Sequence, residues 1–205
     1  MAALVTNERA KAHPKLALLA DAELTTLVAI ASARIERWCG RVLNMDERTE
    51  YYDGSGSRML LLKEYPLVEL TGVVVVESDG TETTLDVDSF DMDAESGEVW
   101  FAPWSTEGAY GTFPQGKKNI KITYIGGYAL TEIEQAEETD SILIPEDLKE
   151  AVVLLAAYLL STQRKDLSIN GYRLDAYAET RREPEEGVPP EVASLAAPYR
   201  DIEVA

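Results

Sequence analysis

The chain has little of what redox, thiolate-metal or histidine chemistry requires. It contains one cysteine, Cys39, so it cannot form an internal disulfide bond or a four-thiolate metal site. Nothing in it requires an oxidising compartment, and a reducing cytoplasm suits it. It also contains one histidine, His13, which precedes Pro14 and lies far in sequence from any serine or cysteine in a nucleophile context. We interpret His13 as a solvated loop residue, and a histidine-based triad is disfavoured.

Long hydrophobic runs are absent as well. The longest, residues 151–160, has ten residues, whereas a helix that spans a bilayer needs about 20. The N-terminus lacks the basic start, uninterrupted apolar core and small-residue cleavage site of a secretory signal. We therefore expect residues 151–160 to form a buried helix of a soluble protein and the N-terminus to be mature sequence.

Basic residues are scarce relative to acidic ones. The 205 residues include 37 Asp and Glu against 19 Lys and Arg, for a formal net charge of −18. Binding of phosphates requires clustered Lys and Arg that displace counterions, and a surface this acidic repels polyanions. The composition therefore disfavours a nucleic-acid reader.

Apolar residues spaced three and four apart predict an amphipathic helix over residues 21–40. We expect Asp21 to accept hydrogen bonds from the first free amides, Glu23 to favour the positive end of the dipole, and Gly40 to supply a left-handed stop. The predicted buried face consists of Leu24, Leu27, Val28, Ala31, Ile35 and Trp38.

From residue 49 to residue 129 the period becomes that of β-strands, and turn sequences separate about six short strands. We expect a bend at Tyr65-Pro66, because proline cannot donate to a sheet ladder, and a turn at residues 95–97. Near the end, Ile120, Ile122 and Tyr124 alternate. This stretch has the size of a small sandwich or barrel.

Residues 131–141 are acidic and irregular, which is typical of a solvated connector. Pro145 at the first helical position, followed by Glu146 and Asp147, predicts the start of a second helix that ends at Arg164-Lys165. This helix is apolar nearly all round, so other parts of the structure must cover it.

No candidate catalytic or metal-binding motif has the sequence context or residue spacing that its chemistry requires. Cys39 follows Trp38 at the end of the first helix, where the dipole disfavours a thiolate, so a semi-buried structural thiol is the better interpretation. Residues 86–97 are rich in acids, but Phe90, Asp91 and Gly97 occupy wrong positions for a calcium loop. The glycines of residues 54–57 form a turn, because no helix follows them.

Two further interpretations stay open. Trp100, Phe101 and Trp104 are close in sequence, and they form either a core at a sheet rim or an aromatic platform for a sugar or protein partner. A carboxylate-dependent hydrolase is also possible in principle, yet among 37 acids any one pair is uninformative.

Several segments in this order resemble a known protein family. They are IERWCGR at residues 35–41, TEYYDGSGSRMLLLKEYPLVELTGV, NIKITYIGGY, IPEDLKEAVVLLAAYLL and the terminal LAAPYR. Together they are similar to the head-to-tail connector, or head-completion adaptor, proteins of long-tailed bacteriophages and gene transfer agents. The resemblance covers roughly residues 24–200. In many relatives the β insert is reduced or absent, and this chain has an additional extended N-terminal lead.

The resemblance implies a virion structural protein that has no catalysis and no cofactor. It further implies that the copies form a ring, commonly of twelve, which docks beneath the portal and carries the next tail-side component. The acidic composition indicates in addition that DNA passes through the channel without specific binding. The expected fold class is α+β, a small helical bundle with an inserted antiparallel β module and an extended C-terminal arm. The expected parts are residues 1–48, 49–129, 130–167 and 168–205.

The surplus apolar surface of the second helix agrees with oligomerisation. Residues 168–205 combine polar and proline-punctuated sequence with a short helix at 191–197, and we expect them to dock on the portal. The predicted anchors are Leu195, Pro198, Tyr199 and Arg200. A stopper or tail-terminator protein of the same neck, or a carbohydrate- or protein-binding β module, are the alternatives.

Overall fold

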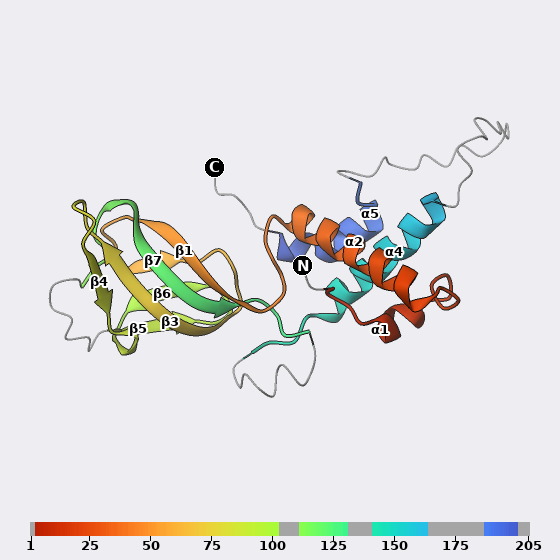
Figure 1. The fold of residues 1–205 in the computed structure, drawn as a ribbon, viewed down its shortest axis with the longest axis horizontal. Helices are drawn as coiled ribbons and strands as arrows, with labels where there is room; N and C mark the ends of the chain where they lie inside the picture. The colour runs from red at the N-terminus through yellow and green to blue at the C-terminus, as the bar shows by residue number, and fades with distance from the viewer. Residues whose placement is uncertain (1–2, 103–110, 131–140, 164–186, 201–205) are drawn as a thin grey trace. The chain divides into compact units, whose positions relative to one another are not determined.

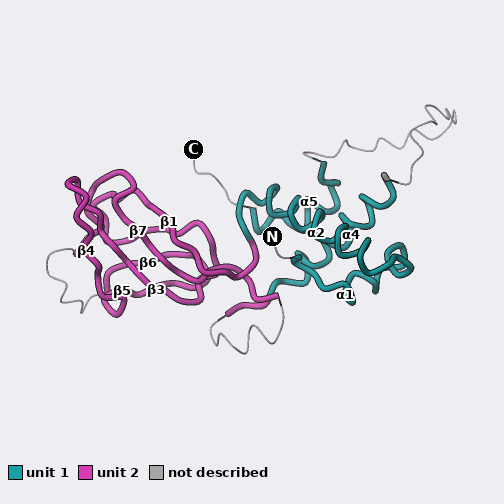
Figure 2. The backbone as a smooth tube through the Cα atoms, viewed as in Figure 1, with its two compact units in different colours: residues 1–42, 144–205 teal, residues 43–143 magenta. Residues whose placement is uncertain are grey.

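The structure is a computed structural model that describes residues 3–102, 111–130, 141–163 and 187–200. It divides into two compact units (Figure 2). The helical unit comprises residues 1–42 and 144–205, and the β unit comprises residues 43–143. The β unit is therefore inserted in the sequence of the helical unit.

The first long helix covers the face that its periodicity predicts. The elements of the helical unit are α1 (Asn7–Lys11), α2 (Asp21–Cys39), α4 (Glu146–Gln163), α5 (Pro190–Ala196) and the 3-10 turn η2 (Ala197–Tyr199) (Figure 1). In α2 all six residues of the predicted apolar face are buried. The helix ends at Gly40, whose φ of 76° is the left-handed conformation that glycine adopts without strain.

The start of the helical unit differs from the prediction. No side chain caps α2, because Ala20 occupies the N-cap position and Asp21 is the first helical residue. The Asp21 carboxylate instead accepts a hydrogen bond from Lys11 Nζ at the end of α1. The expectation that Asp21 caps the helix was wrong, and α1 was not predicted at all.

The second long helix, α4, is buried on almost every side, as its composition predicts. It packs against α2 and α5. It begins at Glu146, so Pro145 directly precedes the helix and does not occupy its first position. Arg9 of α1 forms ion pairs with Glu146 at 3.5 Å and Glu150 at 3.2 Å. The predicted basic end, Arg164-Lys165, lies outside the described residues.

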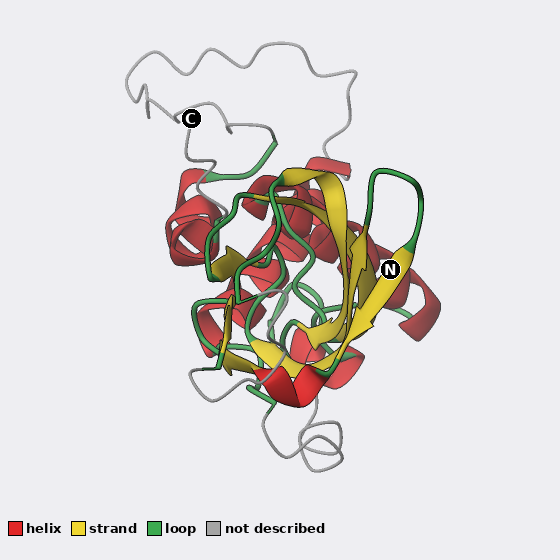
Figure 3. Cartoon of the chain, turned by 90° about the vertical axis from the view of Figure 1, so that its left-hand side faces the viewer, coloured by secondary structure: helices red, strands yellow, loops and turns green. Residues whose placement is uncertain are grey.

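The β unit contains seven strands in the described residues, and all of their pairings are antiparallel. One sheet has the order β1-β7-β3-β4 and the other β2-β6-β5. Figure 3 shows the strands in yellow. Their bounds are β1 (Asp46–Gly54), β2 (Met59–Leu61), β3 (Leu67–Val76), β4 (Glu82–Leu85), β5 (Phe90–Asp93), β6 (Glu98–Phe101) and β7 (Gly116–Gly126).

The two sheets share one hydrophobic core. Ile120, Ile122 and Tyr124 of β7 are all fully buried, which confirms the predicted alternation. Leu60 of β2 and Val99 of β6 belong to the same cluster of buried residues. The inner faces of both sheets thus pack on each other, as in a small sandwich.

Two connections between strands contain the proline and the glycine from which turns are predicted. Tyr65-Pro66 stands between β2 and β3 with a cis peptide bond. Gly97 closes the turn between β5 and β6 with a φ of 76°, and a Cβ there would come within 3.2 Å of the Leu62 carbonyl oxygen. The left-handed backbone conformation therefore favours glycine at residue 97, and the close neighbours leave little space for a side chain.

Burial of α4 predicts that Leu155→Ala is costly. The Leu155 side chain is fully buried, so its truncation leaves a cavity and should lower the free energy of unfolding by about 2 to 5 kcal/mol. Chemical denaturation followed by circular dichroism at the helix band measures the loss. Leu18→Ala is the matched control, because Leu18 is 97% exposed and its truncation should change stability by less than about 0.5 kcal/mol. A loss below about 1 kcal/mol for Leu155→Ala would show that α4 is peripheral.

Candidate functional site

The predicted anchor residues lie at the C-terminal end of the described chain, in the helical unit. Leu195 of α5 is half-buried and Pro198 of η2 is exposed. The Tyr199 hydroxyl donates to Asp147 Oδ2 of α4 at 3.4 Å. The Arg200 guanidinium carbon lies 5.0 Å from the ring centre of Trp38, a cation–π distance. Two of the four anchors therefore contact the chain's own helices.

This arrangement depends on α5. Proline at the first position and apolar side chains at Val192 and Ala196, four residues apart, form a short helix with one buried face. The Cys39 thiol lies 4.0 Å from the Ala196 carbonyl oxygen, so α5 covers the end of α2. Part of the segment for which an extended arm is predicted is thus helical and packed. Residues 164–186 and 201–205 lie outside the described residues, where the arm stays a prediction.

Cys39 is a structural thiol in this setting. Burial raises the pKa of the Cys39 thiol to about 11, and the lowering effects of nearby Arg41 and Arg200 do not offset it. At neutral pH the group is therefore a protonated thiol, which is not a nucleophile.

His13 makes a local contact. Its Nδ1 accepts a hydrogen bond from the Lys15 backbone N–H at 3.3 Å, in the turn that follows α1. We predicted a solvated side chain, whereas His13 is half-buried in the structure. Its bond stabilises a turn and gives it no catalytic partner.

In the acid-rich stretch of residues 86–97, carboxylates accept hydrogen bonds from backbone N–H groups within turns. Asp86 Oδ1 accepts from the Asp88 N–H at 3.2 Å, and Asp93 Oδ1 accepts from the Glu95 N–H at 3.1 Å. Among the described residues, no group of three or more His, Cys, Asp or Glu side chains is arranged to hold a metal ion. The stretch is a polar hairpin in this structure.

One half-buried carboxylate accepts hydrogen bonds from two phenols inside the β unit. Glu50 Oε2 accepts hydrogen bonds from the hydroxyl groups of Tyr52 and Tyr124, the latter at 2.9 Å. The two phenol oxygens accept from the backbone N–H groups of Lys63 at 3.0 Å and Glu64 at 3.3 Å. Burial raises the pKa of both tyrosines above the ordinary value, so neither loses its proton near neutral pH. The cluster ties the connection after β2 to β1 and β7.

The aromatic sequence around Trp100 contributes mainly to the core. Phe101 is buried, with its ring centre 4.6 Å from that of Phe90 and 5.0 Å from that of Phe113. Trp100 is half-buried, and Trp104 lies outside the described residues. The partners Phe90 and Phe113 are not evident from sequence, because they are distant along the chain.

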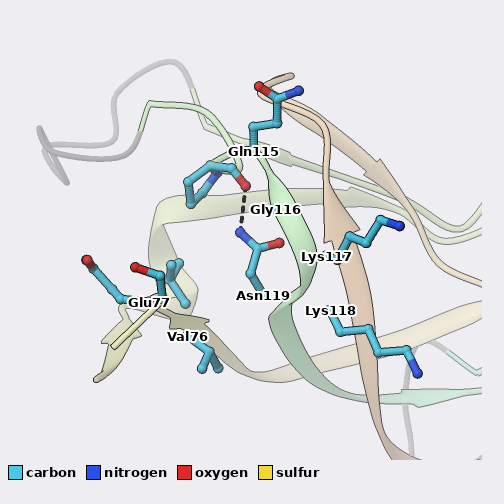
Figure 4. Close-up of a pocket in the computed structure, with 10 residues that line it drawn as sticks. Val76, Glu77, Gln115, Gly116, Lys117, Lys118 and Asn119 are labelled. Carbon is cyan, nitrogen blue, oxygen red and sulfur yellow. Dashed lines mark hydrogen bonds between the residues drawn. The ribbon is translucent and has the colours of Figure 1, made fainter. Parts of the chain in front are cut away.

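A surface hollow of about 520 Å³ lies between the end of β3 and residues 114–119 (Figure 4). The Asn119 side chain donates to the Pro114 carbonyl at 2.8 Å and accepts from the Gly54 N–H at 2.9 Å. Its polar atoms are therefore used within the fold. The Lys117 and Lys118 side chains extend away from Asn119 in Figure 4. The hollow holds no group arranged for catalysis.

Charge is distributed unevenly between the two units. Residues 43–143 contain 21 acidic and 6 basic residues, whereas the rest of the chain contains 16 and 13. Most of the net negative charge thus belongs to the β unit. In the part of the chain that the structure describes, no helix has the length and apolar character needed to cross a membrane.

Five large apolar side chains are exposed in the described residues: Leu18, Ile30, Tyr51, Met59 and Leu61. Ile30 lies on the outer side of α2, and Met59 and Leu61 lie on the outer side of the edge strand β2. Single exposed apolar groups are ordinary on protein surfaces, whereas neighbouring ones such as Met59 and Leu61 are typical of contacts between proteins.

The comparisons with known proteins decide the family. A family model described as "Head completion protein" matches residues 3–202. The chain belongs to the head completion protein family. No curated protein matches it. The resemblance deduced from the sequence is thereby confirmed, and membership makes the chain a virion structural protein.

Solved structures of related particles share the fold. A chain in "Neck of empty GTA particle computed with C6 symmetry" matches with a TM-score of 0.61 and 18% identity, over 100% of this chain and 95% of that one. A chain in "Neck of native GTA particle computed with C12 symmetry" matches with a TM-score of 0.56 and 17% identity, over 98% and 93%. A third, in "Virion of native gene transfer agent (GTA) particle", gives 0.55 and 17%, over 91% and 81%. The predicted α+β fold class is confirmed.

The buried, protonated state of Cys39 predicts that native protein reacts slowly with thiol reagents. At pH 8 a disulfide reagent should modify the denatured chain at the rate of a free thiol and the native chain at least about 100-fold more slowly. The absorbance of the released thiolate measures both rates. Equal rates in native and denatured protein would contradict the burial of Cys39 beneath α5.

The Glu50 cluster predicts a cost for Tyr124→Phe. The substitution keeps the ring but leaves the Glu64 N–H without its acceptor, so the β unit should lose about 1 to 3 kcal/mol of stability. Thermal or chemical unfolding of the variant provides the test. Tyr51→Phe is the matched control, because the Tyr51 side chain is exposed, and it should change stability little. Similar stability of the two variants would show that the cluster contributes nothing.

Proposed function

We propose that this protein is the adaptor of the neck, a ring that binds the portal of a filled head and presents a docking surface to the next tail-side protein. The observation that carries the proposal is the family match over residues 3–202, supported by a shared fold with neck chains over essentially the whole length. Those neck chains come from particles treated with six-fold and twelve-fold symmetry. Twelve copies is accordingly the ring size that we propose.

A structural role suits the surfaces. Cys39, His13 and the Glu50 cluster are each used within the fold, while apolar groups are exposed on both units. In a cyclic ring each contact joins two different patches of neighbouring copies. The acidic surface would repel DNA and let it pass through the channel without sticking.

The portal contact that we propose uses the C-terminal segment. Pro198 and Arg200 are exposed at the end of the helical unit, next to the half-buried Leu195 and Tyr199. An exposed arginine beside apolar and aromatic groups is a composition found at interaction hot spots. The contacts to Asp147 and Trp38 hold this segment in place before binding, which lowers the entropic cost of association.

Purified portal rings provide the test of the adaptor position. The protein should bind isolated portal directly, and native mass measurement should give a complex with a full ring of copies. Binding only to heads that already carry another neck protein would instead identify a stopper or terminator. Failure to bind heads, tails or portal would contradict the proposed function.

Arg200→Glu should reduce portal binding by roughly tenfold or more, because it reverses an exposed charge at the proposed contact. Co-sedimentation with portal measures the effect. Lys15→Glu is the matched control, since Lys15 is also an exposed basic residue of the helical unit. Both variants should keep the far-ultraviolet circular dichroism of the parent. Equal portal binding by the two variants would remove Arg200 from the interface.

A further inference from the structure

The sheet β2-β6-β5 has apolar side chains on its outward face. Met59 and Leu61 of β2 are 49% and 61% exposed. Trp100 of β6 is paired with Met59 in the register, and its neighbours Val99 and Phe101 point into the core. Because side chains alternate along a strand, Trp100 points outward with Met59 and Leu61. These three residues, here called the sheet patch, form a contiguous apolar surface.

Carboxylates border the sheet patch. Asp91 of β5 is opposite Trp100, and Glu98 of β6 is opposite Leu61 on one side and Asp93 on the other. None of the three carboxylates forms an ion pair with a described residue. A partner that covers the apolar centre would gain by presenting basic groups to this border.

The outer side of α2 has the complementary composition. Ile30, Arg34 and Arg37 are exposed, and their spacing of four and three places them on one stripe of the helix. Neither arginine forms an ion pair with a described residue. These three residues, here called the helix stripe, combine an apolar group with two positive charges that no described carboxylate pairs with.

We propose that the sheet patch of one copy docks on the helix stripe of the next copy, and that this contact joins the ring. This contact rests on the proposed function, because it identifies the surfaces that would join neighbouring copies of the ring. The sheet patch is apolar and bordered by carboxylates, and the helix stripe combines an apolar side chain with two guanidinium groups. Apolar groups can therefore meet apolar groups, and opposite charges can meet. Guanidinium groups pair well with carboxylates in a partly desolvated contact.

The charge distribution favours this pairing over contact between two β units. Residues 43–143 carry 21 acids and 6 bases, so two β units repel each other, whereas the rest of the chain is closer to neutral. A contact between two different patches of identical copies is heterologous, and it leaves each copy with one patch free for the next neighbour. That is the type of contact that closes into a ring.

Cysteine cross-linking tests the proposal. The double variant Ile30→Cys/Leu61→Cys is oxidised at high protein concentration and separated on a denaturing gel without reductant. The expected result is a ladder of dimers, trimers and larger multimers, because each copy can cross-link to two neighbours. Cys39 is buried, and the parent chain, oxidised in the same way, controls for its contribution. The matched control Tyr51→Cys/Ile30→Cys places the first cysteine on β1, in the other sheet, and should give no ladder.

Each alternative gives a different result. Dimers from either single variant would indicate a contact between identical patches, and a fast-migrating monomer from the double variant would indicate a contact within one copy. Either result, or the absence of multimers, would overturn the proposal. Native mass measurement and portal binding of the parent chain test the proposed function separately. If the parent chain forms rings that bind portal but the double variant gives no ladder, the proposed contact is wrong and the adaptor role remains supported.

Charge reversal provides a second test that needs no new cysteine. Arg37→Glu should reduce oligomer formation by roughly tenfold or more, and adding Glu98→Arg in the same chain should restore it. Lys117→Glu is the control, since Lys117 is exposed and belongs to neither patch. Circular dichroism checks that all variants fold. No rescue by Glu98→Arg, with all variants folded, would contradict the pairing of these two surfaces.

Discussion

The helical unit depends on the burial of α4, a helix that is apolar on almost every side. Such a helix is unstable alone in water, and α2 and α5 cover it. Arg9 of α1 also pairs with Glu146 and Glu150 in the first turns of α4. The elements that cover it come from both sides of the inserted β unit. The chain must therefore bring distant segments together before this unit is stable, and its C-terminal segment is part of the fold.

This constraint shapes the proposed docking surface. Because α5 packs on the ends of α2 and α4, it fixes η2 and Arg200 at a defined place in the helical unit. The outer side of α2 remains exposed because its inner side alone meets α4. The β unit is stabilised separately, by a core shared between two sheets and by the Glu50 cluster. It can therefore present its outward face without contributing to the helical core.

Periodicity made much of this fold predictable. The apolar spacing in α2 and the alternation at Ile120, Ile122 and Tyr124 each predicted a buried face, because one side of an element meets a core. The order of segments, more than any single motif, predicted the family. The predicted turn at residues 95–97 forms because glycine at residue 97 adopts a left-handed conformation.

Other features depend on contacts between residues far apart in sequence, which local patterns do not encode. The Asp21 carboxylate pairs with Lys11 and does not cap α2, and α1 is too short to give a periodic signal. Glu50 meets Tyr124 only because β1 pairs with β7, and Arg200 meets Trp38 only because α5 folds back on α2. The sheet patch likewise becomes visible only when the register places Met59 beside Trp100.

The central claim is that the protein acts collectively, as a closed ring at the junction of head and tail. Electron microscopy of the neck in particles that contain this chain tests it most directly, by reconstruction without imposed symmetry. The account predicts a ring of identical copies in contact with the portal, with each helical unit touching a neighbouring copy. Isolated copies that do not touch one another, or no density for this chain at the neck, would contradict it.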